Sequence, residues 1–306
     1  MRRKLYSEIP VKNTDEALEG GNDAGTQTET EIEKPQTITV KSALEYLQEL
    51  GNLGFLDKQL WYRGIGNTNH KLIPSLFRHK TAKTKTEFRS VEENLNETFR
   101  MRSFPYADRS RWENDGDWDQ LFFMQHYRVP TRLLDWSGSP LVSLHFALTS
   151  VHIDDSGAPT SDAAVWVLNP TAWNSAVYTG TRFSGEVLTP KISRINRYAP
   201  KEVYDSSTNF PPVAMRGTNN SARVVAQQGF FTVFGPEKKS MEQIFLEQKL
   251  DSGDQMFPND CLIRFRFPKD CIASMKKEMF ALGVSESTIY PDLEGLALEL
   301  KRICGF

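Results

Sequence analysis

The chain has 306 residues, of which 39% are hydrophobic and 25% charged, a composition typical of a globular protein with a core large enough for one or two domains. The formal net charge of −2 gives no overall attraction to a nucleic-acid backbone or an anionic membrane, although it leaves room for a local basic groove. No apolar run approaches the ~20 residues of a membrane span, and no apolar stretch follows the basic N-terminus, so neither a membrane helix nor a secretory signal is expected.

The cysteines and histidines give no sign of a disulfide framework or a metal centre. Cys261, Cys271 and Cys304 form neither an even set nor a Cys-x-x-Cys pair. The five histidines do not pair with carboxylates at the spacing of metal ligands. We therefore expect a reduced, cytoplasmic protein without a bound metal.

The first 36 residues are rich in Thr, Glu, Gly and Asn and contain few apolar side chains. Such a segment buries too little surface to offset the entropy lost on ordering, so residues 1–36 are predicted to form a flexible tail. Residues 37–306 are then expected to form one domain.

The first ordered element is a short helix. Ser42 and Glu45 have the spacing of a capping box, and Leu44, Leu47 and Leu50 recur at helical spacing as its apolar face.

Further elements follow along the N-terminal half. Residues 60–64 (LWYRG) read as a short strand with Arg63 at its end, because aromatic residues favour strands and glycine permits a turn. Apolar residues at helical spacing predict helices over 86–103 and 117–126, and a third helix after Pro140.

The C-terminal half is richer in predicted strands. Residues 171–220 carry many Ser, Thr, Asn and Pro residues and are expected to be an irregular insertion, and residues 270–282 return to helix. The predicted strands are 163–168, 223–234 with an interruption or turn at Gly229, and 261–267, in which alternate side chains face opposite sides.

The predicted helices and strands together indicate the fold class. We expect an α+β fold, a single mixed domain with central antiparallel or mixed strands flanked by helices.

Residues 120–147 are the most informative stretch, because they place many hydrogen-bonding side chains in an otherwise apolar run. A buried polar group without a partner costs a few kcal/mol, roughly 2–7 depending on the reference state. The stretch therefore predicts either a network that satisfies itself or a binding site. Gly-x-Ser-x-Gly, Walker-type, Gly-x-Gly-x-x-Gly and His-Glu-x-x-His motifs are absent, which excludes the standard hydrolase and nucleotide-binding signatures.

Several short motifs occur in a fixed order: Tyr62-Arg63-Gly64, 74–78 (PSLFR), 125–127 (QHY), 130–137 (PTRLLDWS), Pro140 leading to Phe146-Ala147, 226–231 (AQQGFF) and 290–296 (YPDLEGL). In this combination the chain resembles the FRG domain family, named for an aromatic-Arg-Gly triplet whose aromatic residue is here Tyr62. The resemblance implies an FRG-type domain, in a family that occurs largely in bacteria and phages.

The chain also has a more distant likeness to mono-ADP-ribosyltransferases. These enzymes place an Arg at the end of an aromatic-rich first strand, a Ser/Thr-rich strand before a helix, and a Glu or Gln on another strand late in the chain. Arg63, then Asp135-Trp136-Ser137, then Gln227 or Gln228 follow the same order. The likeness implies an ADP-ribosyltransferase-like fold with NAD as a co-substrate.

The implied roles can be stated physically. Arg63 pairs with the pyrophosphate, Tyr127 or Trp136 stacks on nicotinamide, and a late polar side chain holds the ribose as its positive charge develops. Because a glutamine carries no charge, Glu294 or Asp292 must supply the acid, or the chain binds without turnover. The expected catalytic residues are Arg63, His126, Asp135, Gln228 and Glu294. The expected cofactor-binding residues are Tyr62, Arg63, Gly64, Gln125, Tyr127, Thr131, Arg132, Trp136, Ser137 and Gln227.

Each of these residues also has a structural interpretation. Arg63 and Asp135 can form an ion pair that only fixes the fold, and Arg132 can do the same. His126 can be a core histidine or a general base, and Ser137 can simply cap the following helix.

Three functional hypotheses follow. The first is an NAD-dependent mono-ADP-ribosyltransferase-like toxin or defence effector whose acceptor stays open. The alternative is a non-enzymatic FRG module that senses a nucleotide or other ligand in a phage-defence or regulatory system. A hydrolase or nuclease with an unrecognised site comes third. A nucleotide-type small molecule is the expected partner, without a membrane and with no support from net charge for nucleic acid.

Overall fold

The computed structural model describes residues 35–54, 57–106, 116–218, 222–248, 253–254 and 256–306. By its internal contacts the chain divides into residues 1–32 and residues 33–306, and the elements below belong to the second unit. Apart from Pro35 and Gln36, the expected flexible tail over 1–36 lies outside the described residues.

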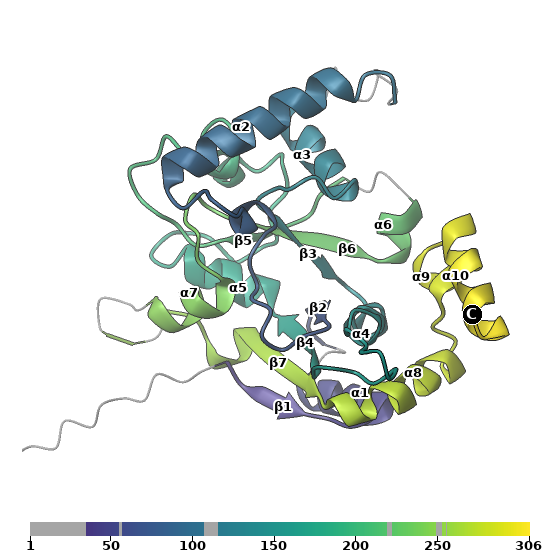
Figure 1. Cartoon of the computed structure of the whole chain (residues 1–306). Helices are drawn as coiled ribbons and strands as arrows, with labels where there is room; N and C mark the ends of the chain where they lie inside the picture. The colour runs from purple at the N-terminus through teal and green to yellow at the C-terminus, as the bar shows by residue number, and fades with distance from the viewer. Residues whose placement is uncertain (1–34, 55–56, 107–115, 219–221, 249–252, 255) are drawn as a thin grey trace, which may run out of the picture. The chain divides into compact units, whose positions relative to one another are not determined.

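The second unit is a mixed α+β structure built on one seven-stranded sheet (Figure 1), which confirms the expected fold class. The strand order is β1-β7-β4-β2-β3-β6-β5, and every neighbouring pair is antiparallel except β1 with β7. The strands are β1 (Thr37–Thr39), β2 (Trp61–Ile65), β3 (Leu133–Ser137), β4 (Ala163–Leu168), β5 (Val213–Met215), β6 (Gly229–Val233) and β7 (Leu262–Phe267).

The sheet consists of two well-paired halves joined at one point. β2 pairs with β4 over five residues, and β3 pairs with β6 over five residues. Between β2 and β3, however, the register contains only Tyr62 opposite Ser137. The facing edges of β2 and β3 are therefore largely unpaired in the middle of the sheet, where backbone groups need other partners.

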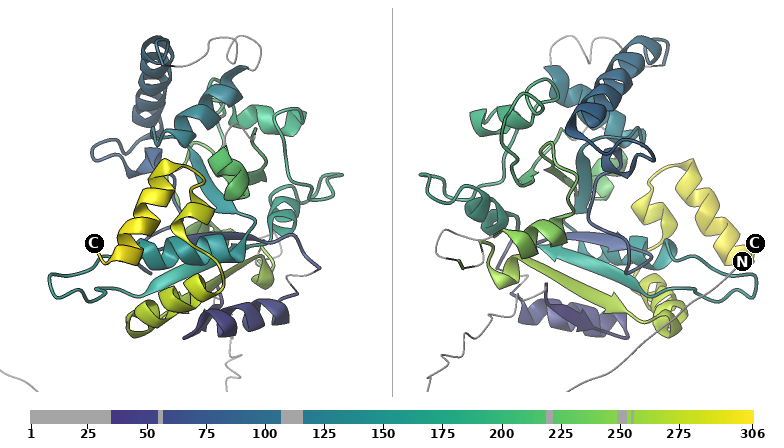
Figure 2. Two further views of the ribbon diagram at one scale, coloured as in Figure 1. Left: turned by 90° about the vertical axis from the view of Figure 1, so that its right-hand side faces the viewer. Right: turned by 60° about the vertical axis from the view of Figure 1, so that its left-hand side comes forward.

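Helices cover the sheet on both faces (Figures 1 and 2). They are α1 (Ala43–Asn52), α2 (Lys85–Arg102), α3 (Gly116–His126), α4 (Pro140–Thr149), α5 (Pro170–Val177), α6 (Ala222–Ala226), α7 (Met241–Glu247), α8 (Ile272–Ala281), α9 (Glu286–Ile289) and α10 (Leu293–Cys304).

Strand alternation divides the interior into two cores. Trp61 and Ile65 of β2 belong to the core on the side of α2, α3, α5 and α7, whereas Tyr62 between them belongs to the core formed with α1, α4 and α8. On β7, Ile263 and Phe265 point into the second core, as the alternation predicted. Cys261 lies just before the strand and packs in the first core instead.

Most predicted elements are confirmed within one or two residues. These are the strands at β2, β4 and β7 and the helices α2, α3, α4 and α8. The prediction that Arg63 ends its strand is wrong, because Arg63 occupies the third of the five positions of β2. The β2 strand continues through Gly64 to Ile65, whose side chain is buried.

Helix α1 is capped as predicted, since the Ser42 side chain accepts a hydrogen bond from the N–H of Glu45. The predicted apolar face is wrong in part, because Leu44 is 64% exposed. The buried face instead includes Tyr46, whose ring packs edge-on against Phe265 and Phe267 of β7. Burial of this large ring decides which side of the helix faces the sheet.

The single strand predicted over 223–234 is wrong in its first half, which forms the short helix α6. Gln228 then adopts a left-handed conformation with φ of 48°, and β6 begins at Gly229. The β-branched Val224 and Val225 favour a strand, but tertiary packing beside α9 overrides that preference.

The stretch over 171–220, expected to be irregular, contributes regular structure and core residues in its described part. It contains most of α5, a 3-10 helix at Ser193–Tyr198 and the edge strand β5. Its side chains in the first core include Leu188, Ile195, Tyr198, Tyr204 and Phe210.

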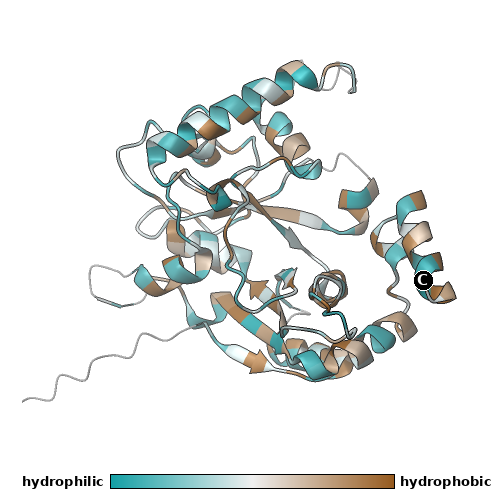
Figure 3. Cartoon of the chain, viewed as in Figure 1, coloured by the Kyte–Doolittle hydropathy of each residue, from teal (hydrophilic) through white to brown (hydrophobic). Residues whose placement is uncertain are grey.

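Hydropathy follows this architecture. In Figure 3 the ribbon of α2 is mainly hydrophilic with separated hydrophobic positions, as expected of a helix with one buried face. No helix in the described part of the chain combines the length and the apolar character that crossing a membrane requires.

Candidate functional site

Two adjoining cavities open where β2 and β3 lose their pairing. The first cavity, of about 270 Å³, is bordered by β2, β3, α4 and the turn between α6 and β6. The second cavity, of about 180 Å³, lies on the side of α3, α6 and Tyr290. The cavities share Asp135, Phe146, Val224, Gln227 and Phe231, so they are two compartments of one site.

Arg63 lies in the first cavity and spans the gap between the two halves of the sheet. Its Nη1 donates a hydrogen bond to the backbone O of Asp135 at 2.6 Å and lies 3.8 Å from the Asp135 carboxylate. Its side chain is 22% exposed, and burial lowers the pKa of Arg63, against the opposing effect of Asp135. Toward the described residues, Nε and Nη2 of Arg63 make no hydrogen bond. Arg63 is therefore a largely desolvated cation with unused donors.

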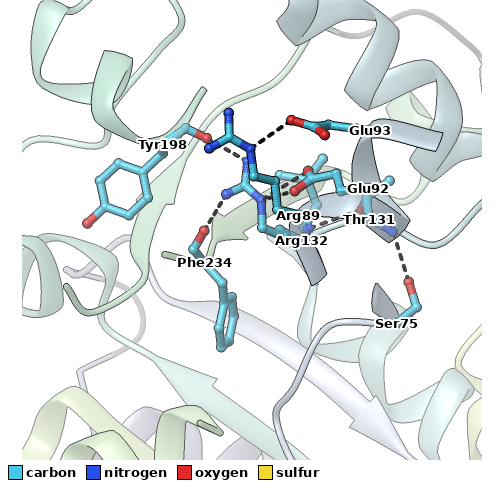
Figure 4. A network of polar contacts seen from close by, with 9 residues as sticks. Ser75, Arg89, Glu92, Glu93, Thr131, Arg132, Tyr198 and Phe234 are labelled. Atoms are coloured by element: carbon cyan, nitrogen blue, oxygen red, sulfur yellow. Dashed lines mark hydrogen bonds and ion pairs between the residues drawn. The ribbon is translucent and has the colours of Figure 1, made fainter. Parts of the chain in front are cut away.

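Arg132 has the opposite surroundings (Figure 4). It is fully buried, and its Nε donates to both carboxylate oxygens of Glu92, at 3.0 and 2.8 Å. Its Nη1 and Nη2 donate to the backbone oxygens of Phe234 and Tyr198. All three nitrogens are used inside the protein, and Arg132 lines neither cavity. Its placement matches the structural interpretation rather than cofactor binding.

Asp135 is held by a chain of hydrogen bonds from α3 and the loop before β3. The N–H of Leu133 donates to Thr131 Oγ1 at 3.0 Å, and this hydroxyl donates to Gln125 Oε1 at 2.5 Å. Gln125 Nε2 then donates to Asp135 Oδ2 at 2.8 Å. Because a backbone N–H can only donate and a carboxylate only accepts, the direction of the whole chain is fixed. Thr131 and Gln125 thus orient Asp135, whose side chain is 58% exposed.

His126 and Tyr127 are neighbours in sequence but belong to different places. His126 lines the second cavity, and burial together with the nearby Arg223 lowers its pKa. Tyr127 lies outside both compartments, beside Phe99, Tyr106 and Phe123 at a separate apolar cavity of about 410 Å³. Stacking of Tyr127 on a ligand held by Arg63 is therefore not supported.

The aromatic-Arg-Gly triplet serves packing as well as the cavity. Tyr62 is buried, and this burial raises its pKa to about 12. A Cβ on Gly64 would collide with the backbone O of Ser143 and the backbone N of Ala147, so glycine is what lets α4 approach β2. Trp136 is also buried and borders the first cavity, with its Nε1 donating to Thr232 Oγ1 at 3.1 Å.

Gln227 and Gln228 lie beside the C-terminal end of β3. Ser137 Oγ donates to the backbone O of Gln227 at 2.6 Å, and the N–H of Gly138 donates to the backbone O of Gln228 at 2.9 Å. Gln227 lines both compartments. Gln228 is exposed and lines neither. Ser137 therefore fastens this turn, and Gln227 is the glutamine that borders the cavities.

Glu294 lies at the rim of the site rather than inside it. Its side chain is 75% exposed and pairs with Arg223, which also binds Asp292. Among the described residues that line the two compartments, Asp135 is the acidic one. No group of three or more His, Cys, Asp or Glu residues that could hold a metal ion occurs in the described part of the chain.

Several lining residues were missed by sequence reasoning. Phe230, Phe231 and Tyr290 fall inside the motifs at 226–231 and 290–296, so those motifs could have indicated them. Arg128 and Arg223 carry no sequence signal and reach the site only through the fold.

Comparison with known families places these observations in context. The family model of the FRG domain matches residues 58–156, a stretch that holds β2, α2, α3, β3 and α4 with Arg63, Gln125 and Asp135. Searches of curated proteins and of solved structures found no match. The match ends before Gln227, Arg223 and Tyr290, which complete the site from the C-terminal half. Residues 58–156 thus match the FRG domain family, and residues of this stretch line the cavities.

Proposed function

We propose that the chain is an NAD-dependent mono-ADP-ribosyltransferase-like effector that binds the dinucleotide in the first cavity. The observation that carries this proposal is the state of Arg63. Its guanidinium is mostly removed from water, yet Nε and Nη2 have no partner among the described residues. A buried cation with unused donors suits an anionic ligand, and a pyrophosphate accepts the two parallel hydrogen bonds that a guanidinium offers.

The remaining walls suit the other parts of NAD. Trp136 and Phe230 supply apolar surface for a ring, and Gln227 supplies a polar side chain. Asp135 stands where the two compartments meet and supplies a carboxylate. These residue types match what a nucleotide pocket requires, an apolar lining with few well-placed polar groups.

In the proposed reaction the bond between C1′ of ribose and the nicotinamide nitrogen breaks. The electron pair leaves with nicotinamide, whose positive charge is neutralised, and C1′ gains cationic character. An acceptor oxygen or nitrogen, or water, forms the new bond to C1′ and releases a proton. Asp135 is the proposed stabiliser of the cationic sugar, in the role that Gln227 and Gln228 cannot fill without a charge.

A second candidate function is a non-enzymatic module that senses a nucleotide. It is favoured by the position of the acidic residues near the end of the chain, because Glu294 and Asp292 form ion pairs with Arg223 at the rim of the site. In that case the same Arg63 pocket holds the ligand without cleaving it.

Nicotinamide release and ligand binding separate the two proposals. Purified protein incubated with NAD is expected to release nicotinamide, measured by chromatography. Asp135→Asn is expected to lower the rate by about 10²-fold or more with little effect on NAD affinity, because it removes charge stabilisation at the transition state. Arg63→Ala is expected to weaken NAD binding in calorimetry, whereas Arg182→Ala, an exposed position outside both compartments, serves as the control.

Binding of NAD without nicotinamide release would favour the sensing module. Absence of both binding and release, in protein whose circular dichroism and melting curve show a folded state, would refute the NAD proposal. Expression in a bacterial host tests the effector role, since a toxin arrests growth and folded Asp135→Asn protein relieves that arrest.

A further inference from the structure

The second cavity has features that NAD binding in the first cavity leaves unused. It holds two arginines, Arg128 and Arg223, together with His126 and the aromatic Tyr290. It meets the first cavity at Asp135, beside the place proposed for the reacting ribose. A group bound there would lie next to the carbon that NAD cleavage exposes.

The backbone of Arg128 adopts a left-handed conformation, which residues other than glycine rarely adopt. It follows the end of α3 with φ of 60°, while its N–H donates to the backbone O of Gln125 at 3.0 Å. Comparable left-handed positions after α8 and at the end of α10 are occupied by glycines, Gly283 and Gly305. Residues held in this region cost of order 1–3 kcal/mol and cluster at functional sites. Glycine would stabilise the turn, so the arginine side chain needs another reason.

The charge of Arg128 is also unmatched. Arg223 pairs with Asp292 and Glu294, whereas the guanidinium of Arg128 makes no hydrogen bond or ion pair within the described residues. Arg128 and Arg223 line this cavity together with Tyr290, and burial raises the pKa of Tyr290 whereas both arginines lower it. Arg128 is thus the cation of the second cavity that remains available to a ligand.

Aromatic surface completes the second cavity. Tyr290 lies under the guanidinium of Arg223 at 4.7 Å and meets Phe146 edge-on at 6.1 Å, and Phe122 stacks on Phe231 at 5.3 Å. Aromatic faces beside an available arginine are the usual means of holding a base and its phosphate.

We infer that the second cavity is the acceptor subsite of the proposed transferase, and that it takes a nucleotide whose phosphate contacts Arg128 and whose base packs against Tyr290. This inference rests on the proposed function. The nucleotide can be free or part of a single strand. The net charge of −2 does not oppose it, because one or two local phosphate contacts suffice.

His126 gives the acceptor a route for its proton. Burial and Arg223 lower its pKa, so its imidazole is neutral and can accept a proton. The acceptor N–H or O–H passes its proton to His126, its lone pair bonds to C1′, and nicotinamide leaves with the glycosidic electron pair. A carboxylate acceptor from an acidic protein segment has no proton to give, which makes the nucleotide the better match.

Arg128→Gly separates ligand binding from folding. A labelled strand of ten deoxythymidines is titrated by fluorescence anisotropy at several salt concentrations. The variant is expected to bind at least about fivefold more weakly, with the slope of log affinity against log salt reduced by about 0.7, the value of one phosphate on a single strand. Its melting temperature is expected to rise by about 2 °C, because glycine relieves the left-handed strain.

Control variants and a competing ligand test the role of the Arg128 charge and show whether the bound nucleotide is free or part of a strand. Arg128→Lys is expected to keep most of the binding, and Arg182→Ala all of it. AMP that displaces the strand at equal phosphate concentration would identify a free nucleotide as the acceptor. Arg63→Ala is expected to lose NAD but retain the strand, because the two ligands occupy different cavities. In the unchanged protein, absence of nicotinamide release together with intact strand binding would refute the transferase and not the nucleotide subsite.

The inference is overturned if Arg128→Gly binds the strand as tightly as the unchanged protein. It is equally overturned if the variant melts at a lower temperature while losing the strand, because Arg128 then supports the fold. Displacement of the strand by a polyglutamate peptide as effective as AMP would assign the cavity to an acidic protein acceptor instead.

Discussion

At the scale of single residues, the same side-chain type serves different purposes according to its partners. Arg63 and Arg132 lie on or beside neighbouring strands of the sheet centre. Arg132 uses every nitrogen within the protein, whereas Arg63 uses Nη1 alone toward the described residues. Hydrogen-bond saturation, rather than residue type, separates the structural arginine from the candidate ligand-binding one.

Thr131 is expected to act on Asp135 through Gln125. Thr131→Val removes the hydroxyl that holds the Gln125 amide, so the amide can rotate and Asp135 Oδ2 loses its donor. The Asp135 carboxyl is therefore expected to lose its fixed orientation in this variant, measured as a shifted or broadened carboxyl signal in carbon-13 NMR of labelled aspartate. Thr131→Ser, which keeps the hydroxyl, is expected to restore the original signal. An unchanged carboxyl signal in Thr131→Val would show that this hydrogen-bond chain does not position Asp135.

The buried pair of Glu92 and Arg132 is expected to be a major determinant of stability. Glu92→Leu leaves the Arg132 charge buried without its partner, which lowers the free energy of unfolding by about 3–5 kcal/mol in urea titrations. The adjacent Glu93 pairs with Arg89 at the surface (Figure 4), so Glu93→Ala should change that free energy by less than about 1 kcal/mol. Similar losses in the two variants would contradict this difference.

At the scale of elements, the site depends on how β2 meets its neighbours. β2 is fully paired with β4 on one side and joined to β3 by a single residue pair on the other. Helix α4 packs closely on β2 at Gly64 and brings Phe146 to the cavities. Local sequence predicted the strand and the helix correctly but could not predict the gap, because strand pairing depends on residues far apart in the chain.

Gly64→Ala is expected to destabilise this contact. The added methyl group meets backbone atoms of Ser143 and Ala147, which cannot rotate away as side chains do. Overpacking of this kind costs typically 1–3 kcal/mol, measured as a lower midpoint of urea unfolding. Gly51→Ala is the control, because Gly51 lies in open space on helix α1 and its substitution should be neutral or stabilising. Gly157 is unsuitable as a control, since its positive φ would strain an alanine. Equal effects at positions 51 and 64 would refute the close approach.

At the scale of the whole unit, buried His145 connects α4 with the charges of the C-terminal helices. Burial lowers its pKa, Glu286 of α9 raises it, and Lys276 of α8 and Arg302 of α10 lower it. Since the folded pKa lies below the unfolded value of about 6.5, protonation favours unfolding. The stability contributed by neutral His145 is complete above about pH 6.5 and is lost as pH falls toward the folded pKa.

His145→Gln is expected to remove this contribution to pH dependence. The free energy of unfolding, measured by urea titration between pH 7.5 and pH 5, should fall less in the variant than in the unchanged protein. His126 also has a lowered pKa and remains in both proteins, so part of the fall persists. Identical slopes in the two proteins would show that His145 is not the group responsible.

Local patterns in the sequence predicted most of the helices and strands and the match to the FRG domain. Caps and apolar spacing predicted α1 and α2, alternation predicted β7, and the motifs from Tyr62 to Ser137 indicated the FRG domain that the family model also matches. These features depend on residues close together in the chain, whose preferences are local.

Which candidate residues share a site depends on contacts between distant parts of the chain, and the fold was needed to show it. Arg63, Asp135 and Gln227 line the first cavity at the β2–β3 gap, whereas Arg132 is buried in the core. Tyr127 and Glu294 lie outside both cavities. The partners of Arg132 lie 40, 66 and 102 positions away in sequence, so no local pattern reports them. Burial and hydrogen-bond saturation are properties of such distant contacts, and they decide whether a polar residue supports the fold or faces a ligand.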